Sequence, residues 1–136
     1  MDTQAIETLL RQAQLPTDGI ERNPGNFIVA TENAALVGAA GFEKCGKDSG
    51  LLRSVAVLPE YRKRGIAREL YRRVALQARC SRISALYLLT TTAQGYFARL
   101  GFAETSRIDA PQAIKETRQF RVSCPASAIF MCRSIQ

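Results

Sequence analysis

The hydrophobic period of this chain changes at Gly65, and this change constrains the fold more than any other feature. Before it, residues 51–57 alternate along the two-residue period of a β-strand. After it, apolar residues recur at the three- and four-residue spacing of one helical face, with arginines on the other. The short connection 58–64 is basic and holds one proline. The sequence therefore predicts a strand, a tight charged turn and an amphipathic helix in direct succession.

The same periods predict the other elements. The expected order is a helix over 3–14, strands over 27–30, 35–42 and 51–57, a helix from 66, a buried central strand over 85–90, a helix over 93–100, strands near 103–108 and 127–132, and between these two a helix from 109–111 to about 120. Thr92 is the expected N-cap of the helix over 93–100, and Gly101 its closing residue. The first three strands predict an antiparallel meander. This order indicates one α/β domain over residues 1–136, with a mixed, mostly antiparallel sheet flanked by helices.

Composition excludes several classes of protein. Hydrophobic residues make up 46% of the 136, and no apolar run reaches the roughly 18 residues of a membrane span. The N-terminal residues lack the pattern of a secretory signal, so we expect a cytoplasmic protein. The chain has no histidine, and its four cysteines form no CxxC pair. We therefore expect reduced thiols and no metal site.

The positive charge is concentrated in one third of the chain. Nine basic and two acidic residues lie between Arg53 and Arg82, which accounts for the whole net charge of +7. Such a patch indicates a polyanionic partner, either nucleic acid or a phosphate-rich cofactor. Aromatic residues are only 7%, and those near the patch lie on apolar faces, so no stacking platform for nucleic acid is expected.

The turn itself has the chemistry of an anion site. Gly65 can adopt a positive φ and admits a ligand close to the backbone. The first amides of the following helix have no intrahelical partner, and the helix dipole adds positive potential. The basic residues Arg62, Lys63 and Arg64 add formal charge. A solvated basic turn that only caps the helix is the alternative.

Two motifs here resemble those of the GCN5-related N-acetyltransferase (GNAT) family. Arg62-x-x-Gly65-x-Ala67 matches its (Gln/Arg)-x-x-Gly-x-(Gly/Ala) signature after a Val-x-Val strand, and the segment 96–102 (Tyr-Phe-Ala-Arg-Leu-Gly-Phe) resembles its second landmark. The segments 52–57, 86–93 and 124–128 also resemble amino-acid N-acetyltransferases associated with arsenic-resistance operons, which are similar to the acetyltransferase domain of N-acetylglutamate synthases. The family usually begins with a strand, which here is short or missing. An exposed sheet edge would result, which a homodimer could cover.

The resemblance implies acetyl-CoA as co-substrate and assigns residues to it. Main-chain groups of Val55 and Val57 are expected to bind the pantetheine arm and the acetyl carbonyl, and the amides from Lys63 to Ala67 the pyrophosphate. The strand that ends near Thr91 is expected to splay from the strand that ends at Val57, with the thioester in the gap. The cofactor-binding residues implied in this way are Val55, Val57, Arg62, Lys63, Arg64, Gly65, Ile66, Ala67, Thr91, Phe97 and Arg99.

The proton-transfer groups depart from the family pattern. The position of the family's usual tyrosine acid holds Phe97, so Tyr96 or a water is the expected acid, and Cys124 is a weaker candidate. Without histidine, carboxylates are the main candidate bases, acting through a water. Glu43 is the first choice because it should lie across the hairpin from Leu51. Glu32 is the second, and a solvated charge or simple packing is the alternative role for each of these residues.

Acceptor binding is predicted from charge placed on an apolar strand. Arg53 would share a strand face with Val55 and Val57, and a charge there needs a partner. It would bind a substrate carboxylate or form an internal ion pair with Glu43. Thr90 and Arg118, with Thr117, would complete an amino-acid pocket. The expected reaction is direct attack of a neutral amine in a ternary complex; the alternatives left open are an N-acetylglutamate synthase-like enzyme and an acyl-CoA sensor without turnover.

Overall fold

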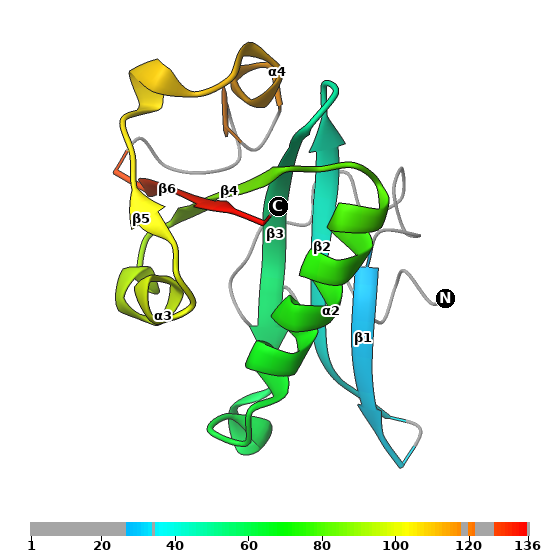
Figure 1. The fold of residues 1–136 in the computed structure, drawn as a ribbon. Coiled ribbons are helices and arrows are strands. Elements are labelled where there is room, and N and C mark those ends of the chain that lie inside the picture. Colours follow the sequence, from blue (N-terminus) through cyan, green and yellow to red (C-terminus); the bar gives the residue numbers. More distant parts are fainter. Residues whose placement is uncertain (1–26, 34, 118–119, 122–126, 136) are drawn as a thin grey trace.

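The computed structural model describes residues 27–33, 35–117, 120–121 and 127–135. These residues form a six-stranded sheet in the order β1-β2-β3-β4-β6-β5 (Figure 1). Its elements are β1 (Phe27–Glu32), β2 (Ala35–Cys45), β3 (Ser49–Val57), η2 (Pro59–Tyr61), α2 (Ile66–Cys80), β4 (Ala85–Thr90), α3 (Gln94–Arg99), β5 (Ala103–Glu104), η3 (Arg107–Asp109), α4 (Gln112–Lys115) and β6 (Ile129–Ser134). The expected first helix and first strand, and residues Arg118 and Cys124, lie outside the described residues.

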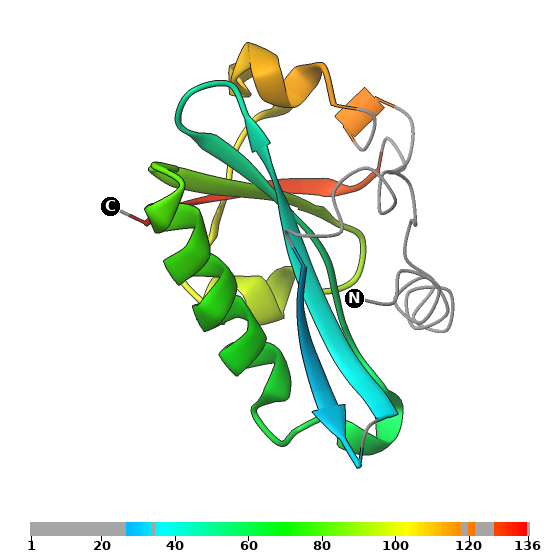
Figure 2. The ribbon, with the colours of Figure 1, turned by 90° about the vertical axis from the view of Figure 1, so that its right-hand side faces the viewer.

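The topology confirms the predicted fold class. β1, β2 and β3 form an antiparallel meander, β3 and β4 pair in parallel, and β6 pairs antiparallel with both β4 and β5. β4 lies inside the sheet between β3 and β6, as its continuous apolar run predicted. Helix α2 lies across one face of the meander (Figure 2) and buries Leu70, Tyr71, Val74 and two alanines against it.

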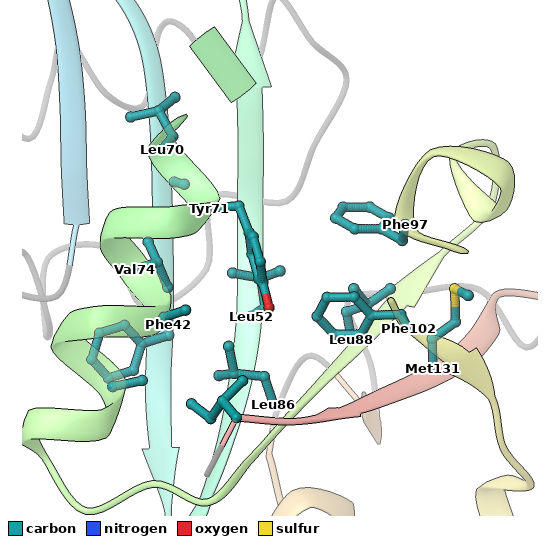
Figure 3. Close-up of a cluster of buried hydrophobic side chains, with 14 of the residues drawn as sticks. Phe42, Leu52, Leu70, Tyr71, Val74, Leu86, Leu88, Phe97, Phe102 and Met131 are labelled. Atoms are coloured by element: carbon teal, nitrogen blue, oxygen red, sulfur yellow. The ribbon is translucent and has the colours of Figure 1, made fainter. Parts of the chain in front are cut away.

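Apolar side chains on the α2 face form one continuous core (Figure 3). It runs from α2 over Leu52 and Leu86 to Phe97, Phe102 and Met131 beside α3. A second cluster on the opposite face joins Leu51 of β3 to Ile114 of α4. The two clusters take alternate residues of the strands, which is why the central strands are apolar on both sides.

Some predicted ends and caps were wrong. The strand expected over 103–108 is only two residues long, and the late helix ends at Lys115. Thr117 explains the helix end, because its hydroxyl donates to the Ile114 carbonyl (2.7 Å) and accepts from the Phe120 amide (3.2 Å), which replaces helical bonds. The cap of α3 is Ala93 rather than Thr92, and Thr90 Oγ1 accepts from its amide at 3.0 Å.

A β-bulge in β3 overturns the predicted strand faces. Gly41 pairs with Arg53 but Ala39 pairs with Ala56, so residues 54–55 together oppose one residue of β2. The extra residue reverses the alternation. Leu52, Val55 and Val57 therefore belong to the α2-side core, whereas Leu51 belongs to the opposite cluster. Arg53 pairs with Gly41, over which the Phe27 ring lies on that opposite side. Arg53 thus does not share a face with Val55 and Val57, contrary to the prediction from simple alternation.

The ladder between β3 and β4 is short, and this confirms the predicted splay. Only Ser49, Gly50 and Leu51 of β3 pair with β4, opposite residues 85–87. Both strands continue beyond these pairs, to Val57 and Thr90, and Figure 1 shows them diverging. The edge of β3 after Leu51 therefore has no strand partner on its β4 side.

Candidate active site

The turn between β3 and α2 has the backbone geometry of an anion cradle. Lys63 has φ = 65° and Gly65 has φ = 79°, on either side of Arg64. Alternation of left- and right-handed residues points successive amides into one concavity. Gly65 is the N-cap of α2 and provides no side-chain capping bond. The first amides of the helix therefore remain accessible to a ligand.

Space in front of the turn is open. A Cβ added to Gly65 would meet no heavy atom within 4 Å, and residues 62–65 are all exposed. Arg64 stacks its guanidinium 5.0 Å from the centroid of the Tyr61 ring. The turn therefore offers backbone amides and positive charge to solvent, as an anion site requires.

Arg62 has a structural bond in addition to its charge. Its Nε donates to the Val57 carbonyl at 3.0 Å, which ties the turn to the end of β3. This bond holds the cradle next to the gap between β3 and β4. The sequence predicted the charge of Arg62 but not this tether.

The main-chain groups at the end of β3 face the gap. The Leu58 amide donates to the Val37 carbonyl of β2 at 2.9 Å. Main-chain groups of consecutive residues in a strand alternate in direction, so those of Val57 point away from β2, where its carbonyl accepts from Arg62 Nε. Contacts of Val55 and Val57 with a ligand in the gap stay predictions. Across the gap stand Leu88 of β4 and Phe97 of α3 (Figure 3).

The two candidate catalytic residues lie on different sides of the sheet. Glu43 is half-buried and pairs with Leu51, as predicted, on the face opposite α2. Arg53 is buried on that same face, at 8% exposure. Tyr96 packs instead against the core on the α2 side. Within the described residues, the gap between β3 and β4 is the place where the sheet is open between these two faces.

Glu32, the second candidate base, already has a partner. The Tyr61 hydroxyl donates to the Glu32 carboxylate, and this bond raises the pKa of Tyr61. The contact joins the end of β1 to the turn before α2. This favours a structural role for Glu32 over the role of base, and no local pattern indicated this pair.

Tyr96 and Phe97 differ sharply in environment. Phe97 is buried and makes edge-to-face contacts with Tyr96 (5.4 Å between centroids) and Phe102 (5.8 Å). The Tyr96 hydroxyl is also buried, yet it has no hydrogen-bond partner among the described residues. Burial raises the pKa of Tyr96, against the opposing effect of the positive charges of Arg68 and Arg99, so the phenol is protonated at neutral pH.

The two threonines at the end of β4, Thr90 and Thr91, lie in different environments. The Thr90 hydroxyl accepts from the Ala93 amide, which fixes the start of α3. Thr91 is exposed beside it. Contacts of either residue with a substrate or cofactor stay predictions.

A groove of about 610 Å³ runs between α2, the end of α3 and the end of β6. Five of its eleven lining residues are arginines, at positions 68, 72, 79, 99 and 133. Arg133 closes one side, because its Nη1 donates to the Tyr71 hydroxyl (3.2 Å) and to the Leu100 carbonyl. Of these arginines, sequence reasoning assigned only Arg99 to the cofactor. The others were missed because the groove joins α2 to elements far away in the sequence, and helical spacing does not show which elements pack beside a helix.

Two of the three described thiols are poor nucleophiles. Burial raises the pKa of Cys45 to about 12 and also raises that of Cys132. Only Cys80 of the three is exposed. A thiol that is protonated at neutral pH does not accept an acetyl group readily, which favours a route without an acyl-cysteine.

Two further features, a cluster of metal ligands and a membrane-spanning helix, are absent from the described residues. Within the described part of the chain, no group of three His, Cys, Asp or Glu side chains is placed to hold a metal ion. No helix in those residues is long and apolar enough to cross a membrane.

Comparison with known proteins identifies this architecture. Residues 23–104 match the family model of the acetyltransferase (GNAT) domain. The chain belongs to the GNAT acetyltransferase family. Over 95 residues, 69% of its length, it is 34% identical to an amino-acid acetyltransferase of Pseudomonas fluorescens. The matched part covers 22% of that relative, so the chain spans only about a fifth of it.

Solved GNAT structures show the same fold. N-acetylglutamate synthase from Neisseria gonorrhoeae, complexed with coenzyme A and N-acetyl-glutamate, superposes with a TM-score of 0.83 at 21% identity, covering 96% of this chain and 32% of that one. Rv2747 from Mycobacterium tuberculosis, in a complex that contains CoA, gives 0.82 at 20% identity, with 98% and 93% coverage. At this identity the likeness concerns the fold.

Proposed function

We propose that this GNAT domain transfers the acetyl group of acetyl-CoA to the primary amine of a small amino-acid-like substrate. The observation that carries the proposal is the splay of β3 from β4 directly beside the amide cradle at residues 63–67. A pantetheine arm is long and narrow, and its diphosphate is anionic, so one ligand would occupy both features. The names of the relatives support an amino acid as acceptor.

The donor would lie on the α2 side. Amides from Lys63 to Ala67 would hold the diphosphate, while the main chain of Val55 and Val57 would bond the pantetheine arm and the acetyl carbonyl. Such a bond stabilises the oxyanion as the amine attacks. Arg62 keeps the two subsites together through its bond to Val57.

The acceptor would approach from the opposite face, which Arg53 shares with Glu43 because Gly41 pairs with Arg53 and Glu43 with Leu51. Arg53 would bind the substrate carboxylate, with Thr90 and Arg118 as further contacts. Glu43 would take a proton from the ammonium group through a water, because the attacking amine must be neutral. The departing thiolate would take a proton from Tyr96 or from a water.

Arg53→Ala tests the carboxylate contact. We expect KM for amino-acid acceptors to rise about 10-fold or more, as loss of a charge-assisted hydrogen bond implies. Arg121, which is exposed on the described chain, provides the matched control as Arg121→Ala. If Arg53→Ala leaves KM for every amino-acid substrate unchanged, the assignment of Arg53 is wrong.

The acceptor itself is tested by release of CoA thiol with a panel of amines. The panel should contain glutamate, other amino acids, and phosphinothricin- and arsinothricin-like analogues. Preference for the analogues would support a role in arsenic or phosphinothricin-type resistance, and preference for glutamate an N-acetylglutamate synthase-like role. Tight binding of acetyl-CoA without turnover on any amine would contradict the enzyme and support the second candidate, an acyl-CoA sensor, which the absence of the usual tyrosine at Phe97 favours.

We also infer a single domain over residues 1–136, a cytoplasmic location and a homodimer. The dimer rests on the sheet, whose outer strands in the described residues are β1 and β5, because an open strand edge favours pairing with a second copy. Light scattering at several concentrations tests it, and a monomer at all of them would exclude it.

A further inference from the structure

The arginine-lined groove beside α2 has charge that the proposed reaction does not use. Five arginines and one glutamate line it, together with Tyr71, Leu100 and small or apolar residues. The glutamate, Glu69, is already paired with Arg72 (2.6 Å) and with Arg73 (2.9 Å). The groove therefore presents a clear excess of positive charge.

The arginines of the groove differ in how far they are engaged. Arg72 bonds Glu69, and Arg133 bonds the Leu100 carbonyl and the Tyr71 hydroxyl. Arg68 and Arg79 of α2 and Arg99 of α3 are exposed, and none of the three forms a salt bridge within the part of the chain that the structure describes. Of these three, Arg79 acts electrostatically on Tyr71, whereas Arg68 and Arg99 act on Tyr96.

A buried hydroxyl lies within electrostatic reach of Arg68 and Arg99. The Tyr96 hydroxyl is buried without a hydrogen-bond partner among the described residues. The guanidinium of Arg99 lies 5.9 Å from the Tyr96 ring centroid, and the charges of Arg68 and Arg99 both act on its hydroxyl. An unsatisfied donor is costly when buried, so a ligand acceptor at this point would be strongly favoured.

We propose that Arg68, Arg99 and the Tyr96 hydroxyl bind the phosphate monoester on the ribose of the donor, the 3′-phosphate of acetyl-CoA. This inference rests on the proposed function. Two guanidiniums and a phenol O–H can all donate, and a phosphate monoester supplies three acceptor oxygens and up to two charges.

The position along α2 agrees with this assignment. Arg68 is three residues beyond Gly65, a rise of about 4.5 Å at 1.5 Å per residue. In the donor only the ribose separates the 3′-phosphate from the diphosphate, so both can be bound in neighbouring subsites. Tyr96 then serves donor binding, and a water protonates the departing thiolate.

Calorimetry with CoA and 3′-dephospho-CoA tests the proposal without any acceptor. The two ligands differ only in the phosphate in question. We expect the unmodified protein to bind CoA about 10- to 100-fold more tightly, the range for one or two charge-assisted hydrogen bonds. In Arg68→Gln and Arg99→Gln this preference should fall at least threefold, while affinity for dephospho-CoA stays within twofold.

Arg73→Gln is the matched control, because Arg73 is on the same helix but does not line the groove. It should keep the full preference for CoA. Tyr96→Phe should lower the preference for CoA over 3′-dephospho-CoA in the same titration. Equal affinity of the unmodified protein for both ligands, or an undiminished preference in both arginine variants, would overturn the proposal.

Two further results separate the possible failures. The first is a titration with inorganic phosphate alone. A binding free energy equal to the difference between CoA and 3′-dephospho-CoA would indicate a free-anion site and overturn the assignment to the donor. A phosphate-dependent preference that requires Arg68 and Arg99, in a protein that acetylates no amine, would support this site while refuting the transferase proposal.

Discussion

Replacing Gly65 by alanine separates the cost of backbone strain from the loss of ligand binding. Gly65 has φ = 79°, a conformation that costs a residue with a Cβ about 1–2 kcal/mol. For a chain of 136 residues this lowers Tm by about 3–10 °C. The added methyl group meets no protein atom within 4 Å, so it causes no steric clash within the fold.

The same methyl group projects into the cradle where the diphosphate is expected. Displacing the ligand from one or two amides would weaken CoA binding by about 10- to 100-fold, since a hydrogen bond to a charged group contributes about 1.5–3 kcal/mol. Thermal unfolding and calorimetric titration with CoA measure the two effects independently, at a temperature where the variant is folded.

Gly46→Ala is the matched control. Gly46 has a similar φ of 68° but lies in the β2–β3 turn, where a Cβ would come 3.2 Å from Ala113. It should lose at least as much stability and keep its affinity for CoA. If Gly65→Ala binds CoA within twofold of the unmodified protein, the backbone of this turn does not hold the donor, and the argument from its geometry is refuted.

Three other predictions concern the described side chains. Arg133→Gln should lower the free energy of unfolding by about 1–3 kcal/mol, and a double-mutant cycle with Tyr71→Phe should give a coupling of at least about 0.5 kcal/mol; additive effects would exclude the contact. Iodoacetamide at pH 8 should modify the exposed Cys80 well before the buried Cys45, whose pKa is raised to about 12. Mass spectrometry of early time points measures the order, and modification of Cys45 first would contradict the protection of its thiol by burial. The pKa of Glu69 is lowered from 4.5 to about 2 by its bonds to Arg72 and Arg73, so its contribution to stability is present above pH 4.5 and is lost as the pH falls through 2. A Tm difference between the unmodified protein and Glu69→Gln that is as large at pH 2 as at pH 6 would contradict that cause.

Features set by local period could be predicted from the sequence. The helix after Gly65, the central strand at 85–90 and the closing role of Gly101, whose φ is 100°, all follow from spacing and from glycine's freedom at positive φ. The position and backbone conformation of the turn before α2 were predicted for the same reason.

Features set by register could not be predicted. A bulge adds one residue to β3 without leaving a mark in its composition, so alternation assigned Arg53 to the wrong face. Thr92 looked like the helix cap, but the hydroxyl that accepts the bond belongs to Thr90, because the chain turns sharply after β4. The Arg133 contacts join residues 33 and 62 positions apart, which no local pattern encodes.

In the proposed reaction, the splay and the two faces of the sheet would let two substrates bind at the same time. Arg53 lies on the face opposite α2, while the main chain of Val57 points away from β2 toward the gap. The donor can then enter from the α2 side and an amine from the other, so neither has to leave before the other binds. Direct transfer needs such simultaneous access, whereas an acyl-enzyme route would need a reactive nucleophile at the gap. Cys45 and Cys132 are unsuited to that role because their raised pKa values keep both thiols protonated. The geometry of the sheet and the chemistry of these side chains therefore favour the ternary complex for independent reasons.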